Sequence, residues 1–356
     1  FSAFSPFMFM TFFLSGVDLS MTLIGLLVAL LFSSIGAMVQ ICCAALSQDT
    51  HSQQFFRGAG IFVQVTSYFS LMGMGSELVR YGGVRFWGFN GGPGLYATIL
   101  ASSLLLIYLL FRAAVAVIQP TGADRMRAVR LTASGGWLLT LAMAVYWALE
   151  AASARFIILW GGLVCAILVL MTMVAVSERD RISERVARDL PAGQTGRRLA
   201  FIISSGAAGG LAWVAMMTAF TVLVVNLFAG LTRLPYRGDL NEASIAMLTF
   251  MSFSIGYGLF AAFIRRAFFS GMVEIRNNWV IMLLVFVGFS VLPMFLGVFV
   301  GSNSDLIMMG NPFVASSKLA EGVLAGIGVL FFGLLINFMW LKRQVDEFLT
   351  AGQSDK

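Results

Sequence analysis

The chain has 356 residues, of which 59% are hydrophobic and only 11% are charged. Soluble domains carry about 25% charged residues, so this composition excludes an ordinary water-soluble fold. The formal net charge of +6 does not indicate nucleic-acid binding, because it is explained by basic loops that face anionic lipid on one side of a membrane.

Apolar runs of about 20 residues, the length that a helix needs to cross the hydrocarbon core, recur along the whole chain. They are continuous rather than alternating, which favours helices over a transmembrane β-barrel. The sequence therefore predicts an all-α, polytopic membrane helical bundle that forms a single transmembrane domain over residues 1–356. Hydropathy predicts nine spans, at 20–46, 58–76, 95–117, 131–149, 156–176, 200–229, 243–264, 279–301 and 322–341.

The chain opens with Phe1 and a short apolar segment that Pro6 interrupts. This segment lacks a basic region followed by a small-residue cleavage site, so it does not resemble a signal peptide. We interpret it as a re-entrant or interfacial piece, or as the end of a helix that begins upstream. We therefore expect the sequence to be a fragment of a longer protein.

Lys and Arg are unevenly divided between the two sets of loops that nine spans create. One set holds 17 of the 23 basic residues, and the positive-inside rule assigns that set to the cytoplasm. This assignment places the loop 177–198 and the C-terminal tail 342–356 in the cytoplasm. We expect the protein to lie in a bacterial inner membrane.

The loop 177–198 is the largest cytoplasmic loop and carries six arginines. Ser177 with Asp180 resembles a capping box, and Pro191 ends the helix that it predicts. An apolar stripe at Ile182, Val186 and Leu190 makes this helix amphipathic, so it either lies on the lipid headgroups or contacts a partner. The candidate partner contacts are Arg179, Arg181, Arg185 and Arg188.

Catalytic and metal-binding patterns are missing from the sequence. The single histidine, His51, lies in a polar loop and makes no metal site, and no P-loop or nucleophile motif is present. The cysteines Cys42, Cys43 and Cys165 lie in apolar runs as packing residues. We expect no enzymatic activity and no cofactor, and the scarcity of ionisable residues within the spans disfavours an ion-driven carrier.

Small residues occur at the spacing that lets two membrane helices approach closely. Gly206 and Gly210 form one GxxxG pair, and Gly322 and Gly326 form another. We interpret both pairs as helix-packing faces within the chain, with a homo- or hetero-oligomer interface as the alternative.

Two short patterns resemble the permeases of exporter-type ABC transporters. SPF at 5–7 and NPF at 311–313 each precede a long span, and the loop at 178–191 contains Glu-Arg-Asp, then Ser-Glu-Arg-Val, then Pro. The resemblance implies a transport permease that works with a separate P-loop ATPase, whose stroke cytoplasmic helices receive. The chain departs from that family by having nine predicted spans instead of six and by lacking an N-terminal coupling segment. The alternatives are a secondary carrier, a non-catalytic membrane subunit that anchors or assembles a cell-envelope complex, and a membrane enzyme that acts on a lipid-linked sugar.

Overall fold

The computed structural model describes most of residues 93–268 and 311–351. The described residues are 10, 30–31, 33–41, 85–86, 89–90, 93–119, 123–150, 153–178, 183–191, 193–231, 237–268, 284–285, 287–288, 311–317 and 319–351. By its internal contacts the chain divides into two compact units, residues 1–119 and 120–356, where the sequence predicts one transmembrane domain.

In the first unit the main described element is a long apolar helix that follows a small hairpin. The predicted span 95–117 falls inside this helix, although its most apolar stretch, Leu100–Ala116, is short for a membrane crossing. The predicted spans 20–46, in large part, and 58–76 lie outside the described residues. The elements are β1 (Arg85–Phe86), β2 (Phe89–Asn90), which pairs with β1 antiparallel, and α4 (Pro93–Ile118).

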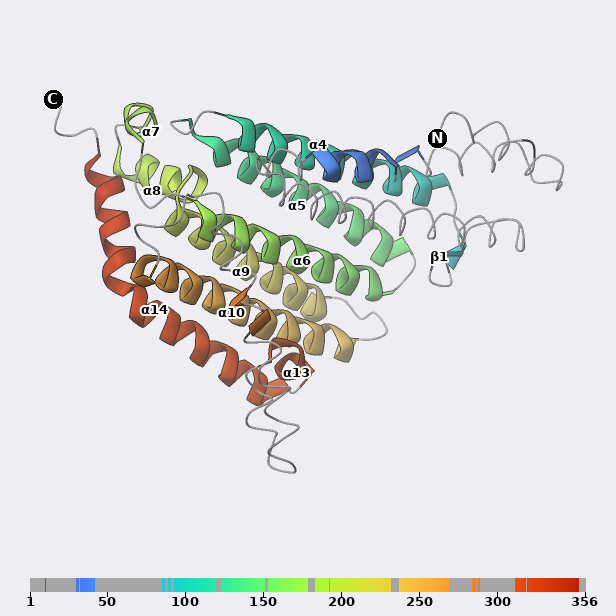
Figure 1. Cartoon of the computed structure of the whole chain (residues 1–356). Helices are drawn as coiled ribbons and strands as arrows, with labels where there is room; N and C mark the ends of the chain where they lie inside the picture. The colour runs from blue at the N-terminus through green and yellow to red at the C-terminus, as the bar shows by residue number, and fades with distance from the viewer. Residues whose placement is uncertain are drawn as a thin grey trace. The chain divides into compact units, whose positions relative to one another are not determined.

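The second unit is helical throughout its assigned elements (Figure 1). They are α5 (Arg125–Glu150), α6 (Arg155–Ser177), α7 (Glu184–Arg188), α8 (Gln194–Ile203), α9 (Ala207–Leu231), α10 (Arg237–Phe268), α13 (Pro312–Ser317) and α14 (Leu319–Thr350). Of these, α5, α6, α9, α10 and α14 are long and apolar enough to cross a membrane. The protein is thus a helical membrane protein, and these five helices correspond to five of the nine predicted spans.

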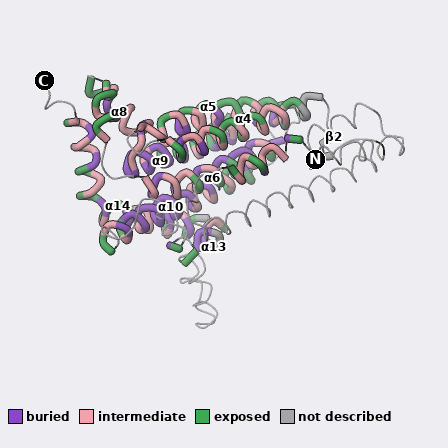
Figure 2. The backbone as a smooth tube through the Cα atoms, turned by 45° about the horizontal axis from the view of Figure 1, so that its top comes forward, coloured by how far each residue is buried: buried purple, intermediate pink, exposed green. Residues whose placement is uncertain are grey.

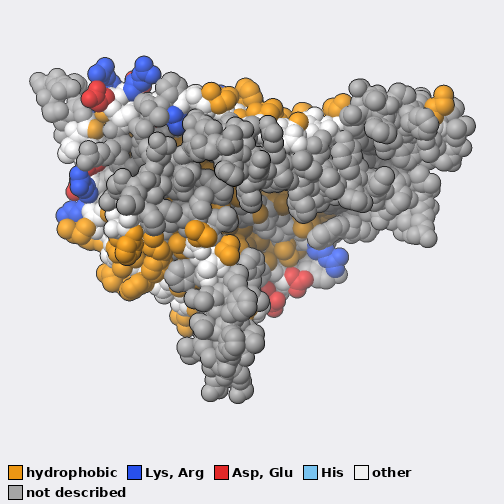
Figure 3. Space-filling view, in the orientation of Figure 1, with side chains coloured by type: hydrophobic (Ala, Val, Ile, Leu, Met, Phe, Trp, Pro, Cys, Tyr) orange, Lys and Arg blue, Asp and Glu red, His pale blue; other side chains and the backbone are white. Residues whose placement is uncertain are grey.

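The helix α10 lies at the centre of the second unit, between α9 and α14 (Figure 1). Its inner residues are almost all buried (Figure 2), among them Met251, Phe253 and Tyr257. Small residues permit this packing: a Cβ at Gly258 would lie 2.8 Å from a methyl carbon of Thr172 on α6. The outward faces of α5, α6 and α14 instead expose leucine and phenylalanine side chains, as lipid-facing helices do. Figure 3 shows hydrophobic side chains gathered over α14, at the lower left of the view.

Contacts between the helices fix their relative directions. The ends of α6 and α10, the start of α5 and the start of α9 share one end of the bundle, because Arg130 contacts Glu178 and Arg265 contacts Val176. The helix α14 runs parallel to α10, since Gly326 lies against Thr249 and Asn337 against Leu259. We call the shared end, where α14 also ends, the junction end.

The parallel arrangement of α10 and α14 constrains the connection between them. The helix α10 ends at the junction end and α14 begins at the opposite end, so their connection, residues 269–310, joins opposite ends of the second unit. The predicted span 279–301 belongs to this connection, and all but four of its residues lie outside the described part of the chain. That span stays a prediction.

Three local expectations differ from the structure. The loop 177–198 is not one capped helix, because α6 continues to Ser177 and two short helices, α7 and α8, follow it; the cap of α7 is Ser183, whose Oγ accepts a hydrogen bond from the Val186 N–H at 3.3 Å. The predicted span 200–229 is broken at residues 204–206 between α8 and α9. The predicted tail 342–356 is helical to Thr350, as the last turns of α14.

Candidate functional site

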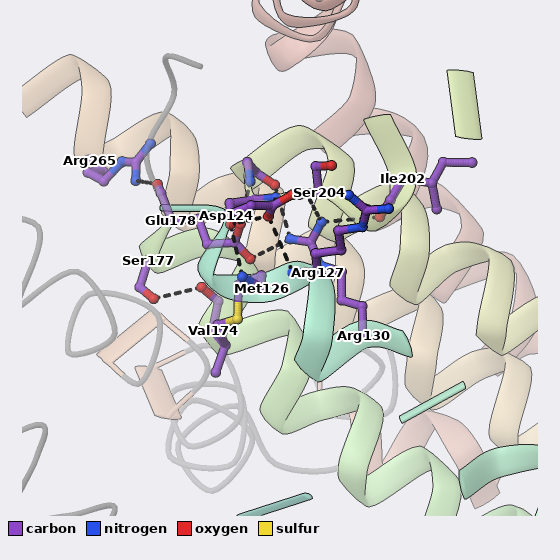
Figure 4. Close-up of polar contacts among 12 residues, drawn as sticks. Asp124, Met126, Arg127, Arg130, Val174, Ser177, Glu178, Ile202, Ser204 and Arg265 are labelled. Atoms are coloured by element: carbon purple, nitrogen blue, oxygen red, sulfur yellow. Dashed lines mark hydrogen bonds and ion pairs between the residues drawn. The ribbon is translucent and has the colours of Figure 1, made fainter. Parts of the chain in front are cut away.

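The break between α8 and α9 is the centre of a buried polar cluster at the junction end. We call residues Ile202–Gly206 the α8–α9 junction. Gly206 has a φ of +154°, a backbone conformation that favours glycine. A helix break leaves carbonyl groups unpaired at the end of one helix and N–H groups unpaired at the start of the next. Side chains from other helices supply the missing partners here (Figure 4).

Arg130, on the second turn of α5, caps the end of α8. Its Nη1 donates to the carbonyl oxygens of Ile202, at 3.1 Å, and Ser204, and its Nη2 donates to that of Gly206 at 3.3 Å. The carbonyl end of a helix carries partial negative charge, so a guanidinium is the favourable ion at this position. The Arg130 side chain is only 4% exposed, so its charge needs a partner.

Glu178, the first residue after α6, provides that partner. Its Oε1 pairs with Arg130 Nη2, and its Oε2 accepts the N–H of Gly206 at the start of α9. The carboxylate therefore sits at the positive end of one helix while the guanidinium sits at the negative end of another. Burial raises the pKa of Glu178, while the Arg130 charge and the Gly206 N–H act in the opposite direction.

Asp124 completes the junction from the chain segment just before α5. Its Oδ1 accepts hydrogen bonds from the Ser205 N–H at 2.8 Å and from the Ser205 hydroxyl at 2.9 Å. The same oxygen accepts the Arg127 N–H at 3.3 Å, in the first turn of α5. In return, Ser205 Oγ accepts the Met126 N–H at 2.9 Å. The start of α5 and the middle of the junction therefore hold each other in place.

Arg265 connects α10 to the same place. Its Nη1 donates to the carbonyl oxygens of Val176, at 2.8 Å, and Glu178, at 2.9 Å. These are carbonyls at the end of α6 that have no partner within that helix. The helices α5, α6, α9 and α10 thus meet at Glu178 and its neighbours (Figure 4).

A third buried arginine, Arg197 on α8, reaches α14. Its Nη1 donates to the carbonyl oxygen of Leu349 at 2.6 Å, and its Nε donates to that of Pro191 at 3.0 Å. The rings of Phe201 and Phe348 meet edge to face beside it, with their centroids 5.5 Å apart. The helix α8 is therefore attached to the last turn of α14 as well as to the junction.

The four arginines predicted to contact a partner have different outcomes. Arg179 and Arg181 lie outside the described residues. Arg185 and Arg188 lie on α7 and are exposed, while Val186 between them is buried. Arg188 pairs with Glu184 at 3.7 Å, but both side chains are mostly in solvent, so the pair is weak. The two arginines are thus available on the surface.

The predicted packing glycines lie in three different settings. Gly210 is tightly enclosed, since a Cβ there would be 2.6 Å from the Cβ of Ala175 and 2.7 Å from Arg130 Nη2. Gly326 lies close to α10, and Gly322 lies directly against the Ala315 carbonyl of α13. Gly206 has open space where a Cβ would be, so the break requires glycine for its φ rather than for packing.

Another polar cluster joins α10 and α14. Asn337 is fully buried, and its Nδ2 donates to the carbonyl oxygens of Leu259, at 3.0 Å, and Gly333, at 2.7 Å. Arg266 donates to Asn337 Oδ1 and lies 4.1 Å over the ring of Trp340. This cluster fixes the two parallel helices in register.

Sequence reasoning did not find Arg130, Glu178 or Arg265 as members of one site. The signal that was present is the length of the predicted span 200–229, which exceeds the roughly 20 residues that a crossing needs. Ser204, Ser205 and Gly206 interrupt it with residues that favour a helix end. The identity of the capping side chains, which come from α5 and α6, carries no local signal.

Among the described residues, no group of three His, Cys, Asp or Glu side chains is placed to hold a metal ion. The contacts that the structure describes at the junction are hydrogen bonds and the Arg130–Glu178 ion pair. Comparisons of the chain with protein-family models, with curated proteins and with solved structures gave no significant match.

Proposed function

We propose that the chain is the membrane-spanning permease subunit of a transporter that a separate P-loop ATPase drives. The observation that carries this proposal is the anchoring of α7. Before α7 in the sequence, Glu178 forms hydrogen bonds with α5, α9 and α10. After α7, Arg197 forms a hydrogen bond with α14. A displacement of α7 would therefore act on all five membrane-length helices at once, as a coupling segment must.

The exposed surface of α7 suits an acidic partner. Arg185 and Arg188 extend from a helix whose underside, at Val186, is buried against this protein. Guanidinium groups bind carboxylates through two parallel, directional hydrogen bonds. Such contacts can transmit a movement of the partner to α7 as well as attract its acidic surface. The proposed contact on the ATPase is a cluster of Asp and Glu side chains.

The distribution of charge supports a cytoplasmic position for the junction end. Among the Lys and Arg residues in the described part of the second unit, only Arg155 and Arg237 lie at the end opposite to the junction end. By the positive-inside rule, this distribution supports a cytoplasmic position for the junction end and for α7, and the membrane that we propose is a bacterial inner membrane. The basic residues of the junction end are Arg125, Arg127, Arg130, Arg185, Arg188, Arg197, Arg198, Arg265, Arg266, Lys342 and Arg343.

An ion-driven carrier receives less support from the same helices. In α5, α6, α9, α10 and α14, every charged residue lies within nine residues of a helix end. Proton and sodium pathways usually place ionisable side chains in the membrane interior. The described helices therefore favour a cycle powered from outside the membrane over one powered by an ion gradient.

The experiment is purification of the protein from its own membranes in mild detergent, followed by identification of the subunits that accompany it. We expect a stoichiometric P-loop ATPase, and we expect the double variant Arg185→Glu/Arg188→Glu to release it. The matched control is Arg343→Glu, which reverses an exposed arginine at the same end of the bundle, on α14. Recovery of the chain without an ATPase, or with envelope enzymes instead, would contradict the proposal and favour an anchoring role.

A further inference from the structure

We infer that the α8–α9 junction is a hinge, with Gly206 as its pivot and the Arg130–Glu178 pair as its latch. The moving part, which we call the arm, consists of α7, α8 and the last turn of α14. In this arrangement Arg130 and Glu178 are positioning residues that act through the junction. The inference rests on the proposed function for its purpose, which is to pass a partner's movement to the spans.

The first argument concerns where the capping groups come from. A permanent turn between two helices is usually satisfied by residues next to it, such as a serine or aspartate at the helix start. At this break, the carbonyls of Ile202 and Ser204 and the N–H of Gly206 are satisfied by Arg130 and Glu178, which belong to α5 and the end of α6. The geometry of the break therefore depends on where two other helices stand.

The second argument concerns the difference between Gly206 and Gly210. A Cβ at Gly206 would meet nothing within 4 Å, whereas one at Gly210 would crowd Ala175 on α6, which lies outside the arm. The start of α9 is thus fixed against its surroundings, while the residue at the break has room around it. Rotation at the break is accordingly concentrated at Gly206.

The third argument is that α8 is attached to one defined neighbouring element. Arg197 and Phe201 attach it to Leu349 and Phe348 at the end of α14. The contacts that hold α14 to α10 lie further back, at Asn337 and at Trp340, which Arg266 covers. The last turn of α14 can therefore follow α8 without loss of the contacts between α10 and α14.

The latch has a polarity that an ordinary ion pair lacks. Arg130 meets carbonyl groups at the end of α8, and Glu178 meets an N–H group at the start of α9. Exchange of the two charges would keep an ion pair but would set each charge against the unfavourable end of a helix. The inference therefore predicts that the exchange Arg130→Glu/Glu178→Arg does not hold the junction in the conformation of this structure. A link that depended only on attraction between the two charges would survive the exchange.

The test measures the distance between two spin labels in the full chain, reconstituted in lipid nanodiscs without any partner. The labels replace Leu199 on α8 and Leu223 on α9, which are 58% and 52% exposed, in a background in which Cys42, Cys43 and Cys165 are alanine. We expect one narrow distance distribution for the parent chain. For Glu178→Gln and for the exchange Arg130→Glu/Glu178→Arg we expect a second population that holds at least a quarter of the molecules.

Two further variants make the result decisive. The exchange Arg343→Glu/Glu347→Arg reverses an exposed ion pair on α14 and should keep the parent distribution. Gly206→Ala leaves the latch residues intact but opposes the positive φ, and it should produce the second population even if the exchange variant does not fold. Unchanged distributions in Glu178→Gln and Gly206→Ala would overturn the hinge. No ATPase is present in this test, so unchanged distance distributions would not contradict the proposed ATPase partner. Conversely, failure to find an ATPase would not contradict a second population in the distance measurement.

Discussion

Glu178 and Arg130 form an ion pair that is almost completely enclosed by protein, with only 9% and 4% of their side chains exposed. They are 48 positions apart in the sequence, and between them they satisfy the broken backbone of a third segment. The pair thus caps the end of α8 and the start of α9 with side chains that come from other parts of the chain.

Removal of one member of this pair should be costly. In Glu178→Ala, the Arg130 guanidinium would stay buried without its counter-charge, and loss of one partner from a buried pair costs about 3–5 kcal/mol of unfolding free energy. Glu347→Ala is the matched control, because its partner Arg343 is 68% exposed and such pairs contribute about 0–1 kcal/mol. Thermal unfolding followed by size-exclusion chromatography in detergent measures both. Equal losses in the two variants would show that burial of the pair is not what matters.

Gly210→Ala should destabilise the bundle by overpacking, because a Cβ there would crowd both α6 and the Arg130 side chain. The new methyl group would lie 2.6 Å from the Cβ of Ala175, and neither side can yield without a shift of α6 or α9. Overpacking of this kind costs about 1–3 kcal/mol. Gly162→Ala on α6 is the control, since a Cβ there meets nothing within 4 Å. Urea unfolding in mild detergent should separate the two, and a neutral Gly210→Ala would mean that the helices are further apart than in this structure.

Asn337→Leu tests the polar link between α10 and α14. The change removes hydrogen bonds to the carbonyls of Leu259 and Gly333 and takes one partner from Arg266. Interhelical hydrogen bonds in membrane proteins contribute about 0.6 kcal/mol on average and up to about 1.7 kcal/mol, so we expect a loss at the upper part of this range. Asn226→Leu, which changes an exposed residue, should lose less in the same thermal assay. The reverse order would contradict the role given to Asn337.

The sidedness of the bundle can be checked with single cysteines and a membrane-impermeant maleimide. In a background without the native cysteines, Arg188→Cys on α7 should be labelled only from the cytoplasmic side. Glu150→Cys and Glu321→Cys, at exposed positions of the opposite end, should be labelled only from outside. Labelling of the α7 and α14 sites from one side would refute the arrangement of the helices, while labelling of all three from the reversed sides would refute only the orientation.

Hydropathy located the five membrane-length helices of the second unit because lipid leaves the backbone few alternatives to a helix. The ends of the helices were less predictable. Ser177 and Ser183 are both residues that can cap the start of a helix. Ser183 is the cap in the structure because α6, packed against its neighbours, continues to Ser177. Likewise, an apolar stretch of 30 residues reads as one tilted span unless the capping groups at its break are known.

The candidate site was the part that sequence could least predict. Arg185 and Arg188 were identifiable because a dense group of arginines in an apolar chain is conspicuous. Arg130 and Arg265 contribute in the same way to a count of basic loop residues, yet they are buried and shared among several helices. Nothing in their immediate neighbourhood in the sequence separates the surface arginines from the buried ones, because the difference arises from tertiary contacts.

Because α10 and α14 run parallel, the side of the membrane on which α7 lies can be determined separately from the total number of spans. Since α14 ends where α6 ends, the last turn at Thr350 and the arginine-rich loop after Ser177 share one side of the bilayer. This holds for any number of crossings before α5. A reporter attached behind Thr350 therefore shows on which side a soluble protein would find α7, even while the total number of spans is still being counted.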